Sequence, residues 1–312
     1  MKTAYGLIHF RSPRKRPAVA LGVFDGLHCG HQRIISRLIK EAKRIRTISL
    51  VVTFFPHPQK EDLLYSLPHR LKLLEESGVD LCLVVRFTRA LRRMTAEEFL
   101  KKILLKKINP AVVFIGRNFT FGRNAEGNWQ LLKEYSGRKK FKLFVMDMLE
   151  LKGKQVSSSR IRGLIRAGKF SKASKLLGRP VIIFGKVTRG YSLGKRLGYP
   201  TANVDAEHEV VPPFGVYSVK VKLAGKYFGG ICYIGDRPTV SSSDRNKSKG
   251  QASIEAHIFG FKGNLYGRKI QIEFVKKIRS QKKFASVREL ARQIRKDIRL
   301  CVTCQAGESL HP

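Results

Sequence analysis

A continuous apolar run that ends in a glycine-rich turn constrains the fold of this chain more than any other feature. Residues 18–24 read Ala-Val-Ala-Leu-Gly-Val-Phe, and a run without polar positions is typical of a strand buried on both faces of a parallel sheet. After the turn, residues 32–46 carry apolar side chains at helical spacing. The order strand, loop, helix therefore predicts an α/β domain.

Similar strands and helices alternate through the first half of the chain. We predict further strands over residues 48–54, 81–85, 111–115 and 142–146. We predict helices over residues 68–77, 96–108 and 128–135. This alternation predicts a doubly wound parallel sheet. Two short helices, separated at residues 167–169, are expected within residues 159–176, where they would bridge the two halves.

The pattern changes beyond Pro180 to short alternating runs separated by Gly, Pro and polar residues. We predict strands over residues 181–187, 215–223, 227–234, 252–259 and 269–275. They indicate a small antiparallel β-barrel or sandwich, closed by an amphipathic helix over residues 287–300, with residues 301–312 frayed. Because 312 residues are enough for two domains, we assign one to residues 1–179 and one to residues 180–312.

Composition limits the classes of protein that fit. No apolar run reaches the ~18 residues of a membrane span, and the N-terminus lacks the apolar segment of a signal peptide. We therefore expect a cytoplasmic protein with no membrane partner. The 5 cysteines form no disulfide framework. Cys301 and Cys304 have CxxC spacing without a second pair, so we interpret that spacing as accidental rather than metal-binding or redox-active.

The net charge leaves a second class of protein open. Lys+Arg number 62 against 23 Asp+Glu, a formal charge of +39, which attracts any polyanion. The basic residues are spread along the whole chain, and no aromatic RNA-binding motif or zinc-finger spacing accompanies them. A basic nucleic-acid-binding protein therefore stays as an alternative that rests on charge alone. The other interpretation is a general excess of Lys and Arg on solvated faces.

The glycine-rich turn contains two histidines, His28 and His31. Its glycines are Gly22, Gly26 and Gly30. Glycines let the backbone approach phosphate oxygens, and the following helix N-terminus adds partial positive charge. Histidines three residues apart share one face of a helical turn and can donate to the same phosphates. A lone histidine is more often a core residue, but a pair in such a turn favours a functional site.

Adenylyl transfer is the chemistry that this turn suits. Negative charge develops on the α-phosphate of ATP as pyrophosphate leaves, so the site needs positioned donors and Mg²⁺. A phosphate nucleophile is already ionised, so His28 and His31 would act as electrostatic stabilisers rather than bases. A second anchor is Ser157-Ser-Ser-Arg-Ile-Arg162, where hydroxyls can cap a helix while an arginine reaches a phosphate. The alternative for this segment is an ordinary capped helix start.

These two motifs resemble those of the HxGH nucleotidyltransferase superfamily. Residues 53–58 (Thr-Phe-Phe-Pro-His-Pro) and 116–127 further resemble the FMN adenylyltransferase half of the bacterial bifunctional riboflavin kinase/FAD synthetase family. The resemblance implies that His28 and His31 are catalytic. The ATP-binding residues it implies are Gly22, Phe24, Asp25, Gly26, Gly30, Asn124, Ser159 and Arg160. The flavin-binding residues it implies are Pro56, His57, Pro58, Asn118, Phe119 and Arg123.

Two positions depart from that family's pattern. Phe55 and Asn118 stand where the family usually has Asp. If those carboxylates help to hold Mg²⁺ or the ATP ribose, this half of the protein is slow or altered in specificity. A riboflavin kinase with an impaired adenylyltransferase half is therefore an alternative.

A second candidate site lies in the barrel-like half. The segment from Gly185 through Gly190 and Gly194 leads to Pro200-Thr-Ala-Asn203. Glycines can fold over phosphates, while the Thr201 hydroxyl and the Asn203 amide oxygen suit a Mg²⁺-triphosphate complex. The alternative is a Gly/Pro turn between barrel strands.

Glu255 is the candidate base of that second site. Residues 253–259 alternate, so that Ser253, Glu255 and His257 share one strand face. An alcohol must lose its proton as it attacks ATP, so a kinase for a small alcohol needs a nearby carboxylate. The alternative is a surface carboxylate that pairs with one of the many Lys or Arg residues.

The motifs of this half follow in the order of the riboflavin kinase domain, which they resemble. The resemblance implies that Glu255 is catalytic and that Thr201 and Asn203 hold Mg²⁺. The other ATP-binding residues it implies are Gly185, Gly190, Gly194, Pro200 and Thr201, and its flavin-binding residues are Arg279 and Phe284. Gln281 and Gly260 replace a common Glu and Asp, which we expect to be peripheral.

Together the two resemblances imply a bifunctional enzyme. ATP would phosphorylate riboflavin to FMN, and a second ATP would adenylylate FMN to FAD with release of pyrophosphate. Mg²⁺ is the implied metal, ATP the co-substrate, and FMN and FAD the product ligands.

Overall fold

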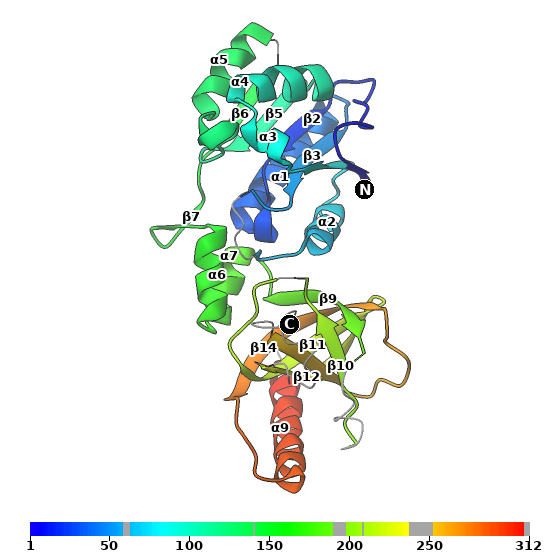
Figure 1. Ribbon diagram of the computed structural model, residues 1–312. Helices are drawn as coiled ribbons and strands as arrows, with labels where there is room; N and C mark the ends of the chain where they lie inside the picture. The colour runs from blue at the N-terminus through cyan, green and yellow to red at the C-terminus, as the bar shows by residue number, and fades with distance from the viewer. Residues whose placement is uncertain (59–62, 140, 190–197, 208, 237–251, 309–312) are drawn as a thin grey trace. The chain divides into compact units, whose positions relative to one another are not determined.

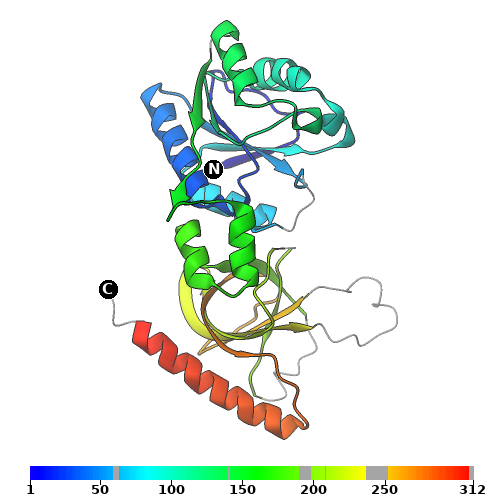
Figure 2. The ribbon, with the colours of Figure 1, turned by 90° about the vertical axis from the view of Figure 1, so that its left-hand side faces the viewer.

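The computed structural model describes residues 1–58, 63–139, 141–189, 198–207, 209–236 and 252–308. The chain forms two compact units, Met1–Arg160 and Ile161–Pro312 (Figures 1 and 2).

The first unit is built on the predicted parallel sheet. Its strands are β1 (Lys2–Tyr5), β2 (Ala18–Leu21), β3 (Ser49–Phe55), β4 (Leu81–Arg86), β5 (Val112–Gly116) and β6 (Lys142–Met146). They lie in the order β1-β4-β3-β2-β5-β6, and every pair is parallel. The direction of the connections reverses at β2, which lies between β3 and β5. In open α/β sheets such a point, at the carboxyl ends of the strands, is where ligands bind.

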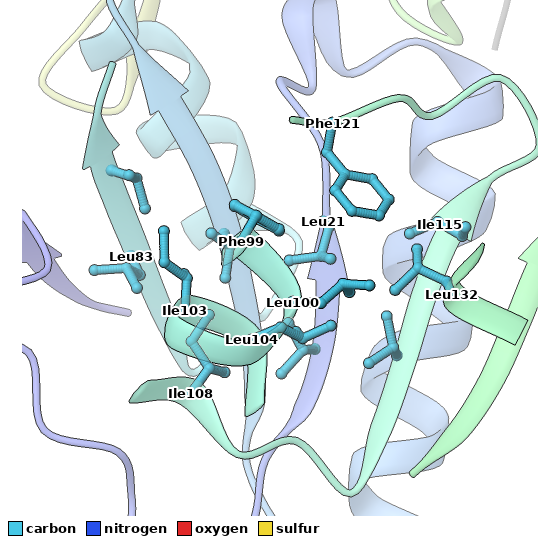
Figure 3. Packing of buried hydrophobic residues seen from close by; sticks show 14 of the residues in the cluster. Leu21, Leu83, Phe99, Leu100, Ile103, Leu104, Ile108, Ile115, Phe121 and Leu132 are labelled. Carbon is cyan, nitrogen blue, oxygen red and sulfur yellow. The ribbon is translucent and has the colours of Figure 1, made fainter. Parts of the chain in front are cut away.

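Helices cover both faces of this sheet. They are α1 (Cys29–Arg44), α2 (Leu67–Glu76), α3 (Arg89–Arg93), α4 (Ala96–Glu98), η2 (Phe99–Ile108) and α5 (Trp129–Lys139). α1 packs against β2, β3 and β5. Figure 3 shows η2, a π-helix, with its apolar side chains turned toward Leu21, Leu83 and Ile115 of the strands. The sequence predicted the helix over 96–108 but missed β1 and α3.

The second unit contains a closed antiparallel barrel, which resolves the choice between barrel and sandwich. Its strands are β9 (Ile182–Thr188), β10 (Ala202–Asp205), β11 (Gly215–Leu223), β12 (Lys226–Asp236), β13 (Ala252–Ile258) and β14 (Lys269–Ser280). They lie in the order β10-β13-β12-β11-β14-β9, and β9 pairs with β10 to close the ring (Figure 2). The sequence missed β10 because it has 4 residues, too few to show an alternation.

The two short helices that follow the first unit are α6 (Ser158–Arg166) and α7 (Phe170–Leu177). The sequence grouped them with the first domain, whereas α7 and all but the start of α6 fall in the second compact unit. The reason lies in packing: the ring of Phe170 contacts those of Tyr217 and Phe274, with centroids 5.7 Å apart in each case.

The expectation of a frayed tail is wrong for residues 301–308, while residues 309–312 lie outside the described residues. The last helix, α9, runs over Val287–Glu308 and packs against β11, β12 and β14. Asp297 and Cys301, one helical turn apart, are 1% and 0% exposed. The buried face of the helix therefore continues past residue 300, and its packing extends the helix beyond the predicted end.

Candidate active sites

The turn after β2 has an unusual backbone conformation. Phe24, Gly26 and Leu27 have φ of 54°, 75° and 37°, all in the left-handed region. Phe24 and Leu27 have side chains that disfavour this region, so surrounding contacts must hold them there. The buried carboxylate of Asp25 supplies two contacts by accepting hydrogen bonds from the backbone N–H groups of Leu64 and Tyr65, at 3.1 and 3.2 Å.

The two histidines of this turn lie together, as their spacing predicted. Their rings are stacked, with centroids 3.7 Å apart and planes 18° apart. His28 is the residue before the first turn of α1, and Phe24 packs its ring against His31 at a centroid distance of 5.3 Å. A Cβ added at Gly30 would lie 3.3 Å from the His28 ring. Glycine at this position therefore leaves room for the first ring, which any larger residue would displace by a few tenths of an ångström.

The serine-rich motif meets the same turn. Ser158 Oγ donates to the carbonyl of Asp25 at 3.0 Å, and Ser157 Oγ accepts from the N–H of Arg160 at 3.3 Å. The Arg160 guanidinium donates to the carbonyls of Lys154 and Gln155, both at 3.0 Å. It is thus held against the hairpin β7 (Glu150–Leu151) and β8 (Lys154–Gln155). Ser159 is exposed.

The remaining predicted residues of the first unit lie on loops after β3 and β5. These strands flank β2 in the sheet, so the three loops leave the same edge. Phe55, the last residue of β3, is 41% exposed; in the loop that follows, Pro56 is exposed, while His57 and Pro58 are half-buried. After β5 come Asn118 and Phe119, with Phe119 stacked on Phe121 at 5.8 Å. The side chains of Arg123 and Asn124 are exposed, and Asn124 has a left-handed φ of 54°.

In the second unit, strand register gathers the predicted kinase residues around Glu255. β10 places Asn203 opposite Glu255, and β12 places Tyr233 opposite it on the other side. Thr201 Oγ1 and Ser253 Oγ both donate to the Glu255 carboxylate, each at 3.3 Å. The predicted alternation along β13 is confirmed, since residues 254, 256 and 258 are buried while the intervening side chains are half-buried.

The negative charge of Glu255 also affects the pKa of Tyr233, its neighbour on β12. Burial raises the pKa of Tyr233, and the carboxylates of Glu255 and Asp236 raise it further. The phenol therefore stays protonated at neutral pH. On the other side, His257 Nδ1 lies 2.8 Å from the carbonyl of Pro200, which fixes the start of β10 against β13.

Gly185, a predicted ATP-binding glycine of the second unit, lies where two strands approach each other closely. A Cβ at Gly185 would collide with the carbonyl oxygen of Asp205 on β10. The close approach of β9 and β10 therefore accounts for this glycine by itself. Gly190 and Gly194 lie outside the described residues.

Arg279, at the end of β14, is held by a residue that the sequence did not single out. Its Nε donates to Asp297 Oδ2 of α9 at 2.8 Å, and Gln293 Nε2 donates to Asp297 Oδ1 at 2.7 Å. The guanidinium lies 5.5 Å from the centroid of the Phe284 ring. An acidic residue on the apolar face of an amphipathic helix was the signal that could have indicated Asp297.

Among the described residues, no helix has the length and apolarity that a membrane crossing requires. None of their clusters brings together three His, Cys, Asp or Glu side chains that could hold a metal ion.

Comparison with known proteins gives matches to both halves of the chain. The family model described as FAD synthetase matches residues 11–160, and the riboflavin kinase model matches residues 177–304. A bifunctional riboflavin kinase/FMN adenylyltransferase from Buchnera aphidicola is 35% identical, covering 96% of this chain and 97% of that protein. Its namesake from Pseudomonas fluorescens is 34% identical and covers 96% of each chain.

A solved structure is also similar over the whole length. A protein from Streptococcus pneumoniae, described as a macrolide-efflux protein, is 27% identical with a TM-score of 0.79, covering 96% of this chain and 99% of that one. The two domains therefore occur together, in this order, in a known structure.

Proposed function

The chain belongs to the family of bifunctional riboflavin kinase/FMN adenylyltransferases, and we propose that each of its two units catalyses one of the two reactions at the site described above. It is an enzyme of flavin biosynthesis that uses ATP, phosphorylates riboflavin to FMN and adenylylates FMN to FAD. We assign the second reaction to the first unit, within residues 1–179, and the first reaction to the second unit, whose barrel lies within residues 180–312. Because ATP is the co-substrate of both, we place the enzyme in the cytoplasm.

The observation that supports the adenylyltransferase site is the stacked histidine pair at the start of α1, beyond the carboxyl end of β2. The helix N-terminus and the two imidazoles present donors to one place, where the charge on the triphosphate increases as pyrophosphate leaves. Further ATP contacts are proposed from Gly22, Phe24, Asp25, Gly26, Gly30, Asn124, Ser159 and Arg160. The flavin is proposed to contact Pro56, His57, Pro58, Asn118, Phe119 and Arg123.

The observation that supports the kinase site is the carboxylate of Glu255 between two side chains that donate to it. As the terminal hydroxyl of the ribityl chain attacks the γ-phosphate, its proton passes to a Glu255 carboxylate oxygen, and ADP leaves. The Thr201 hydroxyl can turn from Glu255 toward phosphate when ATP binds. Pro200 and the glycines at 185, 190 and 194 are proposed to line ATP, and Arg279 and Phe284 to contact the flavin.

Mg²⁺ fits the donors present at the kinase site. The Thr201 hydroxyl and the Asn203 amide oxygen are hard oxygen ligands, and strand register brings both beside Glu255. Mg²⁺ commonly binds through one or two protein oxygens together with substrate phosphates. When bound, it neutralises charge on the phosphates.

A time course tests this assignment. Purified protein with Mg²⁺, ATP and riboflavin should give FMN first and FAD later, measured by HPLC, and FAD at once when FMN replaces riboflavin. If FMN accumulates from riboflavin and supplied FMN gives no FAD, the alternative of an impaired adenylyltransferase half holds. The presence of Phe55 and Asn118 where the family usually has Asp favours that alternative. Formation of neither product, with RNA binding that persists at ~0.2 M salt, would contradict the proposal.

A further inference from the structure

Arg70, in the middle of α2, is a buried charge that neither reaction explains. The residue is 1% exposed, and desolvation lowers the pKa of its guanidinium. The opposing influence is the negative charge of Asp25, which raises that pKa. A charge is costly to bury unless hydrogen bonds and an opposite charge compensate it. The hydrogen-bond partners of Arg70 therefore indicate its role.

Those contacts converge on one backbone carbonyl. Arg70 Nη1 donates to the carbonyl of Val23 at 2.7 Å and to Thr53 Oγ1 at 3.1 Å. Thr53 Oγ1 in turn donates to the same Val23 carbonyl, at 2.8 Å. Arg70, Thr53 and Val23 thus form a closed triangle of hydrogen bonds between α2, β3 and the turn after β2.

Val23 is the last residue before the turn becomes left-handed. Phe24 follows with a φ of 54°, and Leu27 has a φ of 37°. A backbone in this conformation persists only where its surroundings determine it. The carboxylate of Asp25 holds the next peptide units to the segment just before α2. Two opposite charges, Asp25 and Arg70, therefore fix the turn from one side.

We propose that Arg70 is a positioning residue for adenylyl transfer. By holding the Val23 carbonyl it sets the path of the turn, and the turn sets where the stacked rings of His28 and His31 lie. This inference rests on the assignment of the adenylyltransferase site to that turn. Arg70 acts through the backbone and need not touch ATP or flavin.

The test compares Arg70→Lys, Arg70→Met and Thr53→Val in the full-length enzyme. Lysine keeps a charged donor, methionine keeps only the bulk, and valine removes the hydroxyl that completes the triangle. We expect kcat for FAD formation from FMN to fall by roughly 100-fold in Arg70→Met, about tenfold in Arg70→Lys and about threefold in Thr53→Val, because small displacements of catalytic groups are costly. The KM for ATP should change little.

Leu74→Ala is the matched control. Leu74 is 0% exposed on the same helix, so its truncation lowers the melting temperature but removes no hydrogen bond to the Val23 carbonyl, because an alkyl side chain donates none. Riboflavin kinase activity of the same molecules, in the other unit, reports the amount of active enzyme. Rates are corrected for the folded fraction found by calorimetry.

The outcomes distinguish the positioning role of Arg70 from the assignment of the adenylyltransferase site to the turn after β2. A lowered kcat for FAD in Thr53→Val and Arg70→Lys, with Leu74→Ala at the wild-type kcat, supports a positioning role. If all the variants lose stability but keep the wild-type kcat, Arg70 is structural only and the inference fails. If His31→Ala retains full FAD formation, the assignment of the site fails instead.

Discussion

The two sites hold their reactive side chains in different ways. In the first unit, the histidines lie at the junction of a left-handed turn and a helix, and buried polar groups fix the backbone that carries them. In the second, Glu255 lies on a regular strand, and pairing with β10 and β12 places Asn203 and Tyr233 beside it. A site built on a turn depends on backbone support at a distance, whereas a site built on strands depends mainly on the side chains themselves.

The difference matches the chemistry of the two reactions. Adenylyl transfer needs several donors directed at one phosphate, and a helix N-terminus with adjoining side chains supplies them. Phosphorylation of an alcohol needs one correctly placed proton acceptor. The contrast therefore predicts that single side-chain changes act most strongly in the barrel, while changes to backbone geometry act most strongly in the turn.

The largest effect is expected at Glu255. Glu255→Gln keeps the shape of the side chain but cannot accept the proton. Thr201 and Ser253 donate to different carboxylate oxygens, so the single amide oxygen keeps one of these two hydrogen bonds. The kcat for FMN formation should fall about 10²–10⁴-fold, while FAD formation from supplied FMN stays at the wild-type rate, both followed by HPLC. Glu207→Gln, at an exposed carboxylate of the same unit, is the control. Retention of the FMN rate in Glu255→Gln would remove the base from the proposed mechanism.

The next effect is expected at His31. His31→Ala removes the ring stacked on His28 and one donor to the phosphates, so FAD formation should fall about 10²–10³-fold with riboflavin phosphorylation unchanged. His9→Ala, at an exposed histidine outside the turn, should leave both rates unchanged. Equal loss of both activities in His31→Ala would mean that the two sites are not independent.

Sequence patterns were sufficient for the parts of both sites that depend on local spacing. The His-x-Gly-His interval predicted that the two histidines lie together, and the alternation around Glu255 predicted which face of β13 is buried and which is only half-buried. They could not predict Arg70 or Asp297, because the burial of each is decided by segments far away in the sequence, β2 and β3 for the first and β14 for the second. The end of α9 was missed for the same reason: Cys301, beyond the predicted end, is buried by packing against other elements, which local sequence does not show.

Asp297 offers a test of long-range support in the barrel. Asp297→Asn keeps the size of the side chain but removes the charge paired with Arg279, so the KM for riboflavin should rise about fivefold to tenfold, with the KM for ATP unchanged. Gln293→Ala removes only the hydrogen bond to Oδ1 and should have a smaller effect in the same direction. A large fall in kcat without a change in KM would show that strand sites also depend on distant support, against the contrast drawn above.

The smallest effect, and the sharpest test of the turn, is expected at Gly30. Gly30→Ala adds one methyl group that would lie 3.3 Å from the His28 ring, so the imidazole must shift by a few tenths of an ångström. FAD formation should fall about threefold to tenfold, although alanine favours the helix by about 0.5–1 kcal/mol. Gly137→Ala in α5, where the added Cβ meets open space, gives the helical gain alone. Calorimetry and FAD rates on both variants separate the displacement of the His28 ring from the gain in helix propensity. Activity should fall in Gly30→Ala without a loss of melting temperature. An unchanged FAD rate in that variant would show that the first site tolerates displacement of His28.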